Sequence, residues 1–335
     1  MSDTNDIALS VRNLKTFFYT NNRCNKAVNG VSFDVKKGKT LCIVGESGCG
    51  KSVTAATIMQ LLPTLSRIEE GEIIFQKDDK KINIEKLEKN GKEMRAIRGS
   101  DIAMIFQDPM TALNPVYTVG FQISENLKYH THLNKKQIRE KCISLLSDMG
   151  IPLPEQRVDE YPHSYSGGMR QRAMIAMAMA CNPKILIADE PTTALDVTIQ
   201  AQILDLMMDL KDKRKDAAIL LITHDLAVIA ETCDRVIVMY GGVIQEIAPI
   251  DKLFKNPIHP YTKALMDSIP KMDLKEKRLK ALKGMVPSIL ELDDGCKLCS
   301  RFDPEECACK GTKVEQDLVE ISKDHFARVH KELIK

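Results

Sequence analysis

The chain has 335 residues, of which 44% are hydrophobic and 28% are charged, with 48 Lys and Arg against 46 Asp and Glu. This composition excludes a disordered, collagen-like or fibrous protein, and a net charge of +2 gives no bulk basic field for nucleic acid. The polar, acidic start is no signal peptide, and no apolar run approaches the roughly 18 residues of a membrane span, so any membrane role is expected to be peripheral.

Short runs of β-forming residues separated by turn residues open the chain, and they predict a small, mainly antiparallel sheet. These runs are residues 7–11, 31–35 and 71–75. Longer apolar runs without alternation follow, a pattern typical of parallel strands that are buried on both faces and alternate with helices. They are residues 40–44, 102–106, 185–188, 218–223 and 236–240.

Residues 119–165 have a helical pattern, most clearly at 135–149, where apolar residues recur at spacings of three and four. We interpret 119–165 as a helical subdomain inserted into an α/β core. After about Glu246 the signal weakens to a turn, a short helix at 261–268 and a basic linker at 271–283. We therefore place a boundary near Pro270, between a domain of residues 1–270 and a C-terminal extension of residues 271–335.

Residues 45–52 read Gly-Glu-Ser-Gly-Cys-Gly-Lys-Ser, which fits the phosphate-loop pattern G-x-x-x-x-G-K-[ST] between a predicted strand and a predicted helix at 51–61. Glycines let backbone N–H groups close around a β-phosphate, and the helix N-terminus adds positive potential. Lys51 is expected to bridge the β- and γ-phosphates and Ser52 to ligate Mg²⁺. The predicted nucleotide contacts are Gly45, Ser47, Gly48, Cys49, Gly50, Lys51 and Ser52.

The apolar run at 184–188 ends in two carboxylates, Asp189 and Glu190. At the carboxyl edge of a parallel sheet, Asp189 can hold Mg²⁺ and Glu190 can polarise the attacking water. Acidic residues at strand ends are also common helix caps. The phosphate loop in the same chain favours the catalytic interpretation.

Ser166, Gly167 and Gly168 stand before a predicted helix at 169–180. Unpaired N–H groups and the helix dipole make such a start a second anion site. Because one phosphate loop serves one triphosphate, a second site indicates that two chains complete each other. The alternative is a simple serine N-cap on a methionine-lined core helix, and the motifs that follow decide against it.

Three motifs in order resemble the ATP-binding cassette (ABC) family: Ser-Gly-Gly-Met-Arg-Gln-Arg at 166–172, Asp-Glu-Pro-Thr-Thr-Ala-Leu-Asp at 189–196 and Thr-His-Asp at 223–225. Residues 107–115, 161–163 and 256–262 are similar to the ATP-binding subunit of oligopeptide and dipeptide permeases. The resemblance covers essentially the whole chain. It implies an α/β P-loop NTPase of the ABC ATPase type, with an N-terminal antiparallel β subdomain, an inserted helical subdomain and a small Cys-rich C-terminal extension.

The resemblance also implies roles for single residues. Gln107 matches the glutamine that senses Mg²⁺ and the permease, and Asp196 lies in the loop that contacts the partner subunit. His224 matches the histidine that holds the γ-phosphate and the catalytic glutamate in place. Phe18 is expected to stack on adenine, with Tyr19 as the reserve candidate.

Four of the ten cysteines gather near the C-terminus, namely Cys296, Cys299, Cys307 and Cys309. Without an export signal, cysteines are expected to be reduced thiols, and thiolates this close select zinc or an iron–sulfur cluster. The segment resembles the part of the permease subgroup that carries a four-iron cluster. We therefore expect a [4Fe–4S] cluster, with Zn²⁺ or metal-free reactive thiols as alternatives.

The cysteine cluster lies far along the chain from Lys51, Asp189 and Glu190. We therefore expect it to stabilise the extension or its contacts with a partner rather than to take part in catalysis. Cys296→Ser or Cys309→Ser is expected to leave ATP binding largely intact.

These features predict a peripheral ATPase subunit at the cytoplasmic face of the membrane that uses ATP and Mg²⁺ to power uptake of oligopeptides or dipeptides. It is expected to pair with a homologous ABC ATPase, to dock on two transmembrane permease subunits and to receive peptide indirectly from an extracellular binding protein. No nucleic acid partner is expected.

Three alternative functions stay open from the sequence. The first is the same role for nickel, a glycosidic compound or another small solute, because the cassette never touches the cargo. The second is a soluble ABC ATPase of DNA repair or translation, for which two cassettes, a long coiled coil or a basic surface would be expected. The third is a nucleotide-binding regulator without hydrolysis, which the presence of Glu190 and His224 disfavours.

Overall fold

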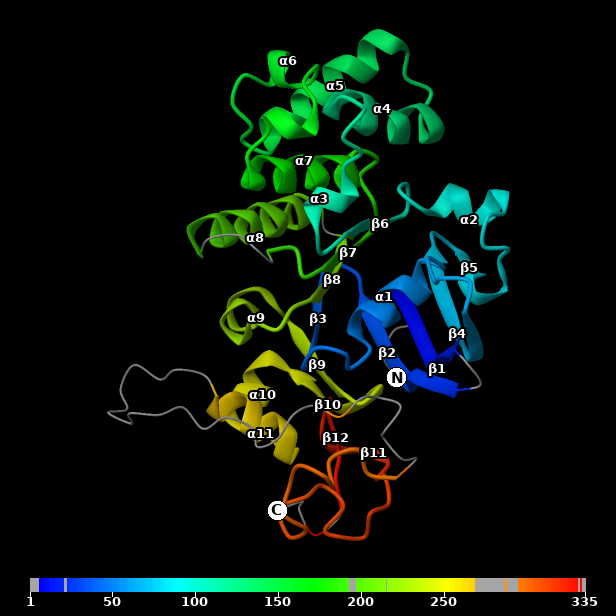
Figure 1. Ribbon diagram of the computed structural model, residues 1–335, viewed down its shortest axis with the longest axis vertical. Coiled ribbons are helices and arrows are strands. Elements are labelled where there is room, and N and C mark those ends of the chain that lie inside the picture. The colour runs from blue at the N-terminus through cyan, green and yellow to red at the C-terminus, as the bar shows by residue number, and fades with distance from the viewer. Residues whose placement is uncertain are drawn as a thin grey trace. The chain divides into compact units, whose positions relative to one another are not determined.

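The computed structural model describes residues 6–20, 23–192, 197–214, 216–268, 287, 295–330 and 332. The chain divides into two compact units, whose elements Figure 1 labels. Unit 1 contains residues up to Leu9, Val35–Lys39 and Ile74–Ile222, and unit 2 contains Ser10–Asp34, Thr40–Ile73 and the residues from Thr223 onward. The boundary predicted near Pro270 and the predicted linker at 271–283 lie outside the described residues.

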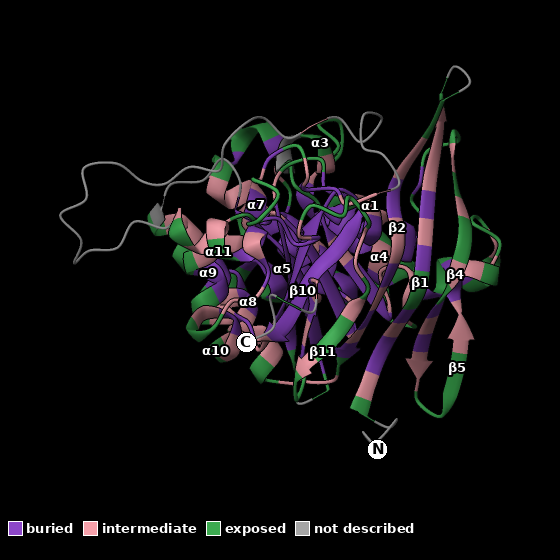
Figure 2. Ribbon diagram, turned by 90° about the horizontal axis from the view of Figure 1, so that it is seen from below, coloured by how far each residue is buried: buried purple, intermediate pink, exposed green. Residues whose placement is uncertain are grey.

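Unit 2 contains a sheet in which β3 and β9 are parallel, with Val44 opposite Val238. Strand β10 runs antiparallel to β9 on one side and to β12 on the other. The order is β11-β12-β10-β9-β3, formed by β3 (Thr40–Val44), β9 (Arg235–Tyr240), β10 (Val243–Pro249), β11 (Leu318–Ser322) and β12 (His325–Arg328). The C-terminal extension thus continues this sheet, and Figure 2 shows β10 buried along nearly its whole length.

The N-terminal strands alternate buried and more exposed positions, as one-sided sheets do. They are β1 (Ile7–Thr20), β2 (Arg23–Lys36) and β4 (Ser66–Lys77), followed by β5 (Lys80–Asn83). Within unit 1 the end of β4 pairs antiparallel with β5, Ile74 lying opposite Asn83. The predicted run at 7–11 is the start of β1, the run at 31–35 lies near the end of β2, and the run at 71–75 lies within β4. Each strand is longer than its apolar run, because the more polar residues that extend it carry no apolar signal.

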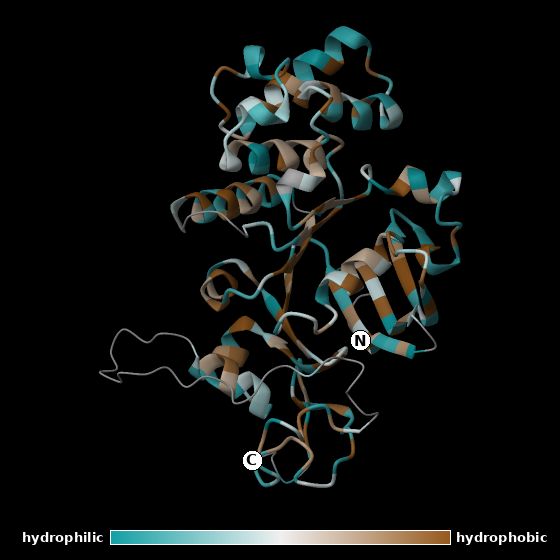
Figure 3. Ribbon diagram, in the orientation of Figure 1, coloured by the Kyte–Doolittle hydropathy of each residue, from teal (hydrophilic) through white to brown (hydrophobic). Residues whose placement is uncertain are grey.

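Unit 1 contains three parallel strands, β8 (Ala218–Ile222), β7 (Ile185–Asp189) and β6 (Ile102–Ile105), with β7 in the middle. Every residue of β7 and β8 is buried, and Figure 3 shows these strands as hydrophobic. The structure confirms parallel strands in this part of the chain, as their unbroken apolar runs predict. Their carboxyl ends meet at one edge, which is where Asp189 lies.

The helices of unit 1 include a group that packs on α7, and Figure 1 shows α4, α5 and α6 together beyond it. Helix α5 begins at a capping box in which Asn134 and Gln137 each accept a hydrogen bond from the other's backbone, and it ends at Asp148 as the periodicity predicts. The helical elements are η2 (Ile84–Lys86), α2 (Lys92–Ile97), α3 (Pro109–Ala112), α4 (Val119–His130), α5 (Lys135–Asp148), α6 (Pro154–Arg157), η3 (Pro162–Ser164), α7 (Gly167–Met179) and α8 (Val197–Asp212).

Unit 2 has four helices among its described residues: α1 (Lys51–Ile58), α9 (Leu226–Thr232), α10 (Ile250–Lys255) and α11 (Pro260–Asp267). Helix α1 packs on β1 through a buried hydrogen bond between the hydroxyls of Thr16 and Thr57, 3.1 Å apart. In the described part of the chain, no helix combines the length and apolarity needed to cross a membrane.

A buried carboxylate, Glu246 on β10, holds the extension and the turn before α11 to the sheet. It accepts hydrogen bonds from the backbone N–H groups of Ile258 and His259, both at 2.9 Å. Its Oε1 also lies 2.7 Å from Nε2 of His325 on β12. Burial lowers the pKa of His259 to about 3, so its neutral ring accepts a hydrogen bond from the Tyr261 N–H and caps α11.

Candidate nucleotide site and cysteine centre

The phosphate loop connects the end of β3 to the start of α1, as predicted. Lys51, at the first position of α1, is 5% exposed. Its ammonium donates to the carbonyl oxygens of Gly45 at 2.7 Å and Glu46 at 3.0 Å. The loop thus holds this cation by its own backbone. Burial raises the pKa of the neighbouring Cys49 thiol, so at neutral pH it stays uncharged and leaves the positive charge of Lys51 available to an anion.

At two positions of this loop, only glycine fits. Gly50 has φ +101°, and a Cβ there would collide with the carbonyl oxygen of Ala27. Gly45 has φ +154°, and a Cβ would meet the carbonyl of Met239 on β9. The loop therefore packs backbone against backbone on both sides, which leaves its N–H groups as the surface offered to a phosphate.

Of the residues predicted to hold Mg²⁺ or to position water, Gln107, Asp189 and Glu190 lie in unit 1, whereas Ser52, at the second position of α1, lies in unit 2. Asp189 ends β7 and is buried, and Glu190 follows it in a left-handed conformation with φ +46°. The Gln107 side chain, two residues beyond β6, donates from Nε2 to Glu190 Oε2 at 2.9 Å. The strand ends of β6 and β7 thus bring the predicted glutamine and glutamate into contact.

The predicted second anion site is the exposed start of α7. Ser166 Oγ accepts a hydrogen bond from the Met169 N–H at 3.3 Å, so the serine is also an N-cap. A Cβ on Gly167 would have no heavy atom within 4 Å, which leaves this helix start open. Gln171, buried in α7, donates to the Pro191 carbonyl and so connects this helix to the segment after Glu190.

The remaining predicted residues are placed as follows. His224 is exposed two residues beyond β8, and Asp225 caps α9 by accepting from the Ala227 N–H at 2.9 Å. Phe18 is half-buried on β1, whereas the hydroxyl of Tyr19 donates to Glu69 at 2.7 Å. Asp196 lies outside the described residues.

The four C-terminal cysteines converge in space. Their sulfur atoms all lie within 4.8 Å of one another, and Cys307 and Cys309 are buried. Neighbouring sulfurs are 3.3 Å apart for Cys299 and Cys309, and 3.6 Å for Cys296 and Cys307. A hydrogen bond from Cys296 lowers the pKa of the Cys307 thiol to about 5. The arrangement can supply four sulfur ligands to a metal.

Glu46, an unassigned position in the motif, is a contact point for the C-terminal part of unit 2. Its carboxylate pairs with Arg301, two residues after Cys299, at 2.5 Å and 3.1 Å, and its N–H donates to the Tyr261 hydroxyl at 3.0 Å. The cysteine segment thus reaches the phosphate loop through Arg301, although it is far from Lys51 along the chain. Distance along the chain does not measure distance in the fold, because β12 returns the extension to the sheet that carries the loop.

Comparisons with known proteins agree with this geometry. Residues 28–193 match the ABC transporter family model, and residues 245–309 match the model of the oligopeptide/dipeptide transporter C-terminal region. A probable peptide ABC transporter ATP-binding protein of Sinorhizobium fredii is 53% identical over 298 residues, 88% of this chain and 87% of the relative. A dipeptide transport ATP-binding protein of Bacillus subtilis is 50% identical over 302 residues, 90% of this chain and 88% of the relative.

The chain belongs to the ABC transporter family. Among solved structures, a dimeric ATP-binding cassette bound to ADP and phosphate superposes with a TM-score of 0.63 and 26% identity, covering 72% of this chain and 98% of that one. The cbiO1 subunit of a Clostridium perfringens ABC transporter complex gives a TM-score of 0.60 and 27% identity, covering 75% and 92%. This ABC protein is therefore an ATPase of the α/β class predicted from its motifs, and it carries the C-terminal region of the peptide-transporter branch.

Three residues around the phosphate loop of this ABC protein were not predicted from the sequence: Glu46, Tyr240 and Tyr261. The two tyrosines are fully buried, with ring centroids 4.8 Å apart. Tyr261 stands in the motif at 256–262 that carries the resemblance to peptide permeases. Its place in this motif could have marked Tyr261 as a candidate functional residue. The motif does not show, however, that the Tyr261 hydroxyl contacts the Glu46 backbone.

Gly50→Ala is expected to weaken nucleotide binding to this chain at least about tenfold, because a left-handed alanine is strained by about 1–2 kcal/mol and its Cβ displaces the Ala27 carbonyl. Gly30→Ala is the matched control, since Gly30 also has a positive φ (+79°) but its Cβ would meet only the end of the Asn13 side chain, at 3.3 Å. Equilibrium binding of a fluorescent ATP analogue to each purified variant measures the difference. Equal affinities for the two variants would show that backbone approach at Gly50 does not shape the loop.

Proposed function

We propose that this chain is the ATP-hydrolysing subunit of an importer of oligopeptides or dipeptides, bound peripherally at the cytoplasmic face of the membrane. One observation carries the proposal: the region at residues 245–309, which matches the oligopeptide/dipeptide transporter model, supplies the tyrosine that contacts the phosphate loop. The peptide-transport names of the relatives point the same way.

The residue roles in hydrolysis form part of this proposal. Lys51 binds the β- and γ-phosphates, and Ser52, Asp189 and Gln107 hold the Mg²⁺ that neutralises charge developing on the phosphates. Glu190 orients the attacking water, with its carboxylate positioned by the hydrogen bond from Gln107. His224 contacts the γ-phosphate, Phe18 stacks on the adenine, and the rest of the loop, Gly45, Ser47, Gly48, Cys49 and Gly50, surrounds the phosphates.

The partners are a homologous ABC ATPase and two transmembrane permease subunits, with an extracellular peptide-binding protein acting indirectly. The exposed N–H groups at Ser166, Gly167 and Gly168 and the segment at Asp196 would complete the partner's nucleotide site. Tyr117 and Phe121 stack with ring centroids 4.8 Å apart and are 47% and 39% exposed. This aromatic pair fits docking on a permease.

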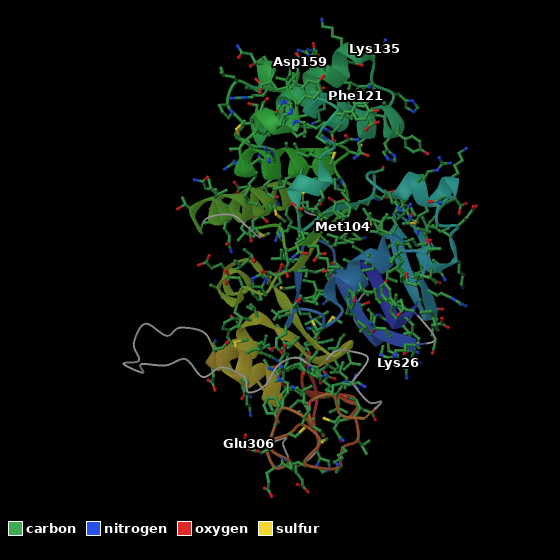
Figure 4. All side chains as sticks on the ribbon, in the orientation of Figure 1. Lys26, Met104, Phe121, Lys135, Asp159 and Glu306 are labelled. Atoms are coloured by element: carbon green, nitrogen blue, oxygen red, sulfur yellow. The ribbon has the colours of Figure 1, made fainter. Side chains whose placement is uncertain are left out.

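Close to that pair, a pocket of about 270 Å³ opens between α4 and α5. Phe121, Lys135 and Asp159, labelled in Figure 4, are among its lining residues. Apolar and charged groups around one cavity match the mixed character of a docking site for a short permease helix.

Glu190→Gln is expected to keep ATP binding and to lower turnover by on the order of 10²–10³, because the amide preserves the contact with Gln107 but cannot accept a proton. Lys51→Ala is expected to weaken both binding and turnover. The measurement is steady-state hydrolysis by the complex assembled with its partner ATPase and permease. Glu231→Gln, on the exposed end of α9, is the control, and full activity of the Glu190→Gln complex would remove Glu190 from this role.

Deletion of this protein is expected to abolish uptake of short peptides, because the ATPase supplies the driving force for the permease. The readout is resistance to a toxic tripeptide, reversed by the wild-type chain and not by Glu190→Gln. Peptide uptake that continues while nickel or sugar uptake is lost would move the assignment to another solute.

We further propose that Cys296, Cys299, Cys307 and Cys309 together hold a metal centre. Four thiolates in so small a volume repel one another unless a cation gathers them. Resemblance to the peptide-permease branch favours a [4Fe–4S] cluster. Zinc is the second candidate. Four of the six sulfur pairs are 3.3–3.9 Å apart, and a tetrahedral ion with bonds of about 2.3 Å sets its sulfurs about 3.8 Å apart.

Anaerobically purified protein is expected to be brown, with broad absorbance near 400 nm and about four irons per chain. Cys309→Ser is expected to lose the colour and the metal, whereas Cys181→Ser, at a half-buried cysteine outside the cluster, keeps both. Colourless protein with one zinc would select the second candidate. Metal-free protein with an ordered C-terminal segment would reject both.

A further inference from the structure

The guanidinium of Arg301 reaches the phosphate loop from the segment that carries the four cysteines. Nη1 lies 2.5 Å from Glu46 Oε2, and Nη2 lies 3.1 Å from Oε1. The Arg301 side chain is only 3% exposed, and the guanidinium lies 5.7 Å from the ring centroid of Tyr240. A two-pronged pairing of this kind fixes the orientation of the carboxylate as well as its position.

The backbone of Glu46 is held at the same time. Its N–H donates to the Tyr261 hydroxyl, and its carbonyl oxygen accepts from the Lys51 ammonium, each at 3.0 Å. Glu46 therefore supplies one of the two carbonyls that hold the cation proposed to bind phosphate. A shift of Glu46 would move that carbonyl and with it the ammonium.

The position of Arg301 depends on the cysteine turn. Residues 295–317 form turns and irregular backbone, without helix or strand. The Arg301 N–H donates to the Leu298 carbonyl at 2.9 Å, which closes the turn that carries Cys299. Isolated backbone hydrogen bonds also hold the segment, from Cys296 to the Lys313 carbonyl at 3.0 Å and from His330 to the Ala308 carbonyl at 2.7 Å. Because no helix or strand adds to them, gathering of the thiolates by a metal would further fix the place from which Arg301 extends.

We propose that Arg301 is a positioning residue of the phosphate loop, and that metal binding by the four cysteines sets nucleotide affinity through it. The inference rests on the proposed metal centre. With metal bound, Arg301 holds Glu46 and the loop is fixed for phosphate. Without metal the turn loosens, Arg301 leaves Glu46, and Lys51 loses a fixed carbonyl partner.

The first part of the test uses the full-length chain, purified anaerobically. Arg301→Met and Arg301→Lys are expected to keep their metal, because arginine is no ligand, and to lower ATP affinity about tenfold. Glu46→Gln is expected to do the same, and the double variant Glu46→Gln/Arg301→Met to be no weaker than either single variant. Arg12→Met is the matched control, since this arginine makes a similar two-pronged pair with Asp34, at 2.7 Å and 2.9 Å, between β1 and β2 of the same unit.

A turnover measurement on the assembled complex separates positioning from a general loss of structure. In the Arg301 variants the KM for ATP is expected to rise about tenfold with kcat within about twofold, whereas partial unfolding would lower kcat at constant KM. If Arg301→Met does not fold, Glu46→Gln gives the same comparison, because the Glu46 side chain is 25% exposed. Unchanged ATP affinity in the Glu46 and Arg301 variants would overturn the proposal.

The second part tests the metal link. Chain distance alone predicts that Cys309→Ser leaves ATP binding largely intact, whereas the contact of Arg301 with Glu46 predicts otherwise. Cys309→Ser, which removes the metal, is then expected to lower ATP affinity about tenfold in the wild-type background and to have no further effect in the Arg301→Met background. Metal loss with unchanged affinity, or an equal loss in both backgrounds, would overturn the link. Wild-type protein without metal would refute the metal centre itself, and the Arg301 and Glu46 variants then still decide whether the contact positions the loop.

Discussion

The paired contact between Glu46 and Arg301 connects the phosphate loop to a segment 255 residues further along the chain. Removing one partner of a fully buried pair costs about 3–5 kcal/mol, because the other charge is left uncompensated, whereas replacing both by apolar residues is often neutral. The cost here is smaller than that, because the Glu46 side chain is 25% exposed. Stability alone therefore does not require charges at this place. Unlike an apolar contact, a two-pronged ion pair is directional. It holds the Glu46 side chain in one orientation and restrains the backbone that Lys51 contacts.

A second buried carboxylate makes that contact possible. Glu246 brings together the turn before α11 and strand β12 by accepting from two backbone N–H groups and contacting His325. The same turn places Tyr261 against the Glu46 N–H, and β12 returns the extension to the sheet of unit 2. The phosphate loop is thus supported by residues that the core ATPase motifs do not include. Of these, Glu246, Tyr261 and Arg301 lie in the region matched by the peptide-transporter model, whereas β12 lies beyond it.

The sequence predicted the parts of the fold that depend on local pattern. Strands β3, β7 and β8 are buried throughout, so their unbroken apolar runs identify them. Strand β10 escaped prediction because it carries Gln245 and Glu246, both buried, and polar residues inside a strand are ordinarily an argument against burial. Glu246 is buried favourably because it accepts hydrogen bonds from the Ile258 and His259 N–H groups and contacts His325. These partners lie elsewhere in the sequence, so the local pattern around Glu246 does not reveal them.

The site was predictable to a similar extent. The loop glycines and Lys51 follow from a motif whose spacing is dictated by phosphate chemistry. Gln107 was identified only by the resemblance to the ABC family, and its contact with Glu190 arises in the structure because the ends of β6 and β7 meet at one edge. The role of Glu46 was not predictable, because the motif leaves that position open and its partner is fixed by the packing of β12 and the cysteine turn.

Relative magnitudes decide the direction in which the cysteine turn and the phosphate loop influence each other. Binding of a structural zinc ion by a zinc-finger peptide is worth about 10–16 kcal/mol at neutral pH, and in such a peptide this energy is also the folding energy. A coupling between two binding sites is typically about 1–3 kcal/mol. Nucleotide binding is therefore too weak to expel the metal, whereas loss of the metal is large enough to release Arg301. The cysteine centre would control the loop, and ATP would only bias the metal affinity by the same small factor.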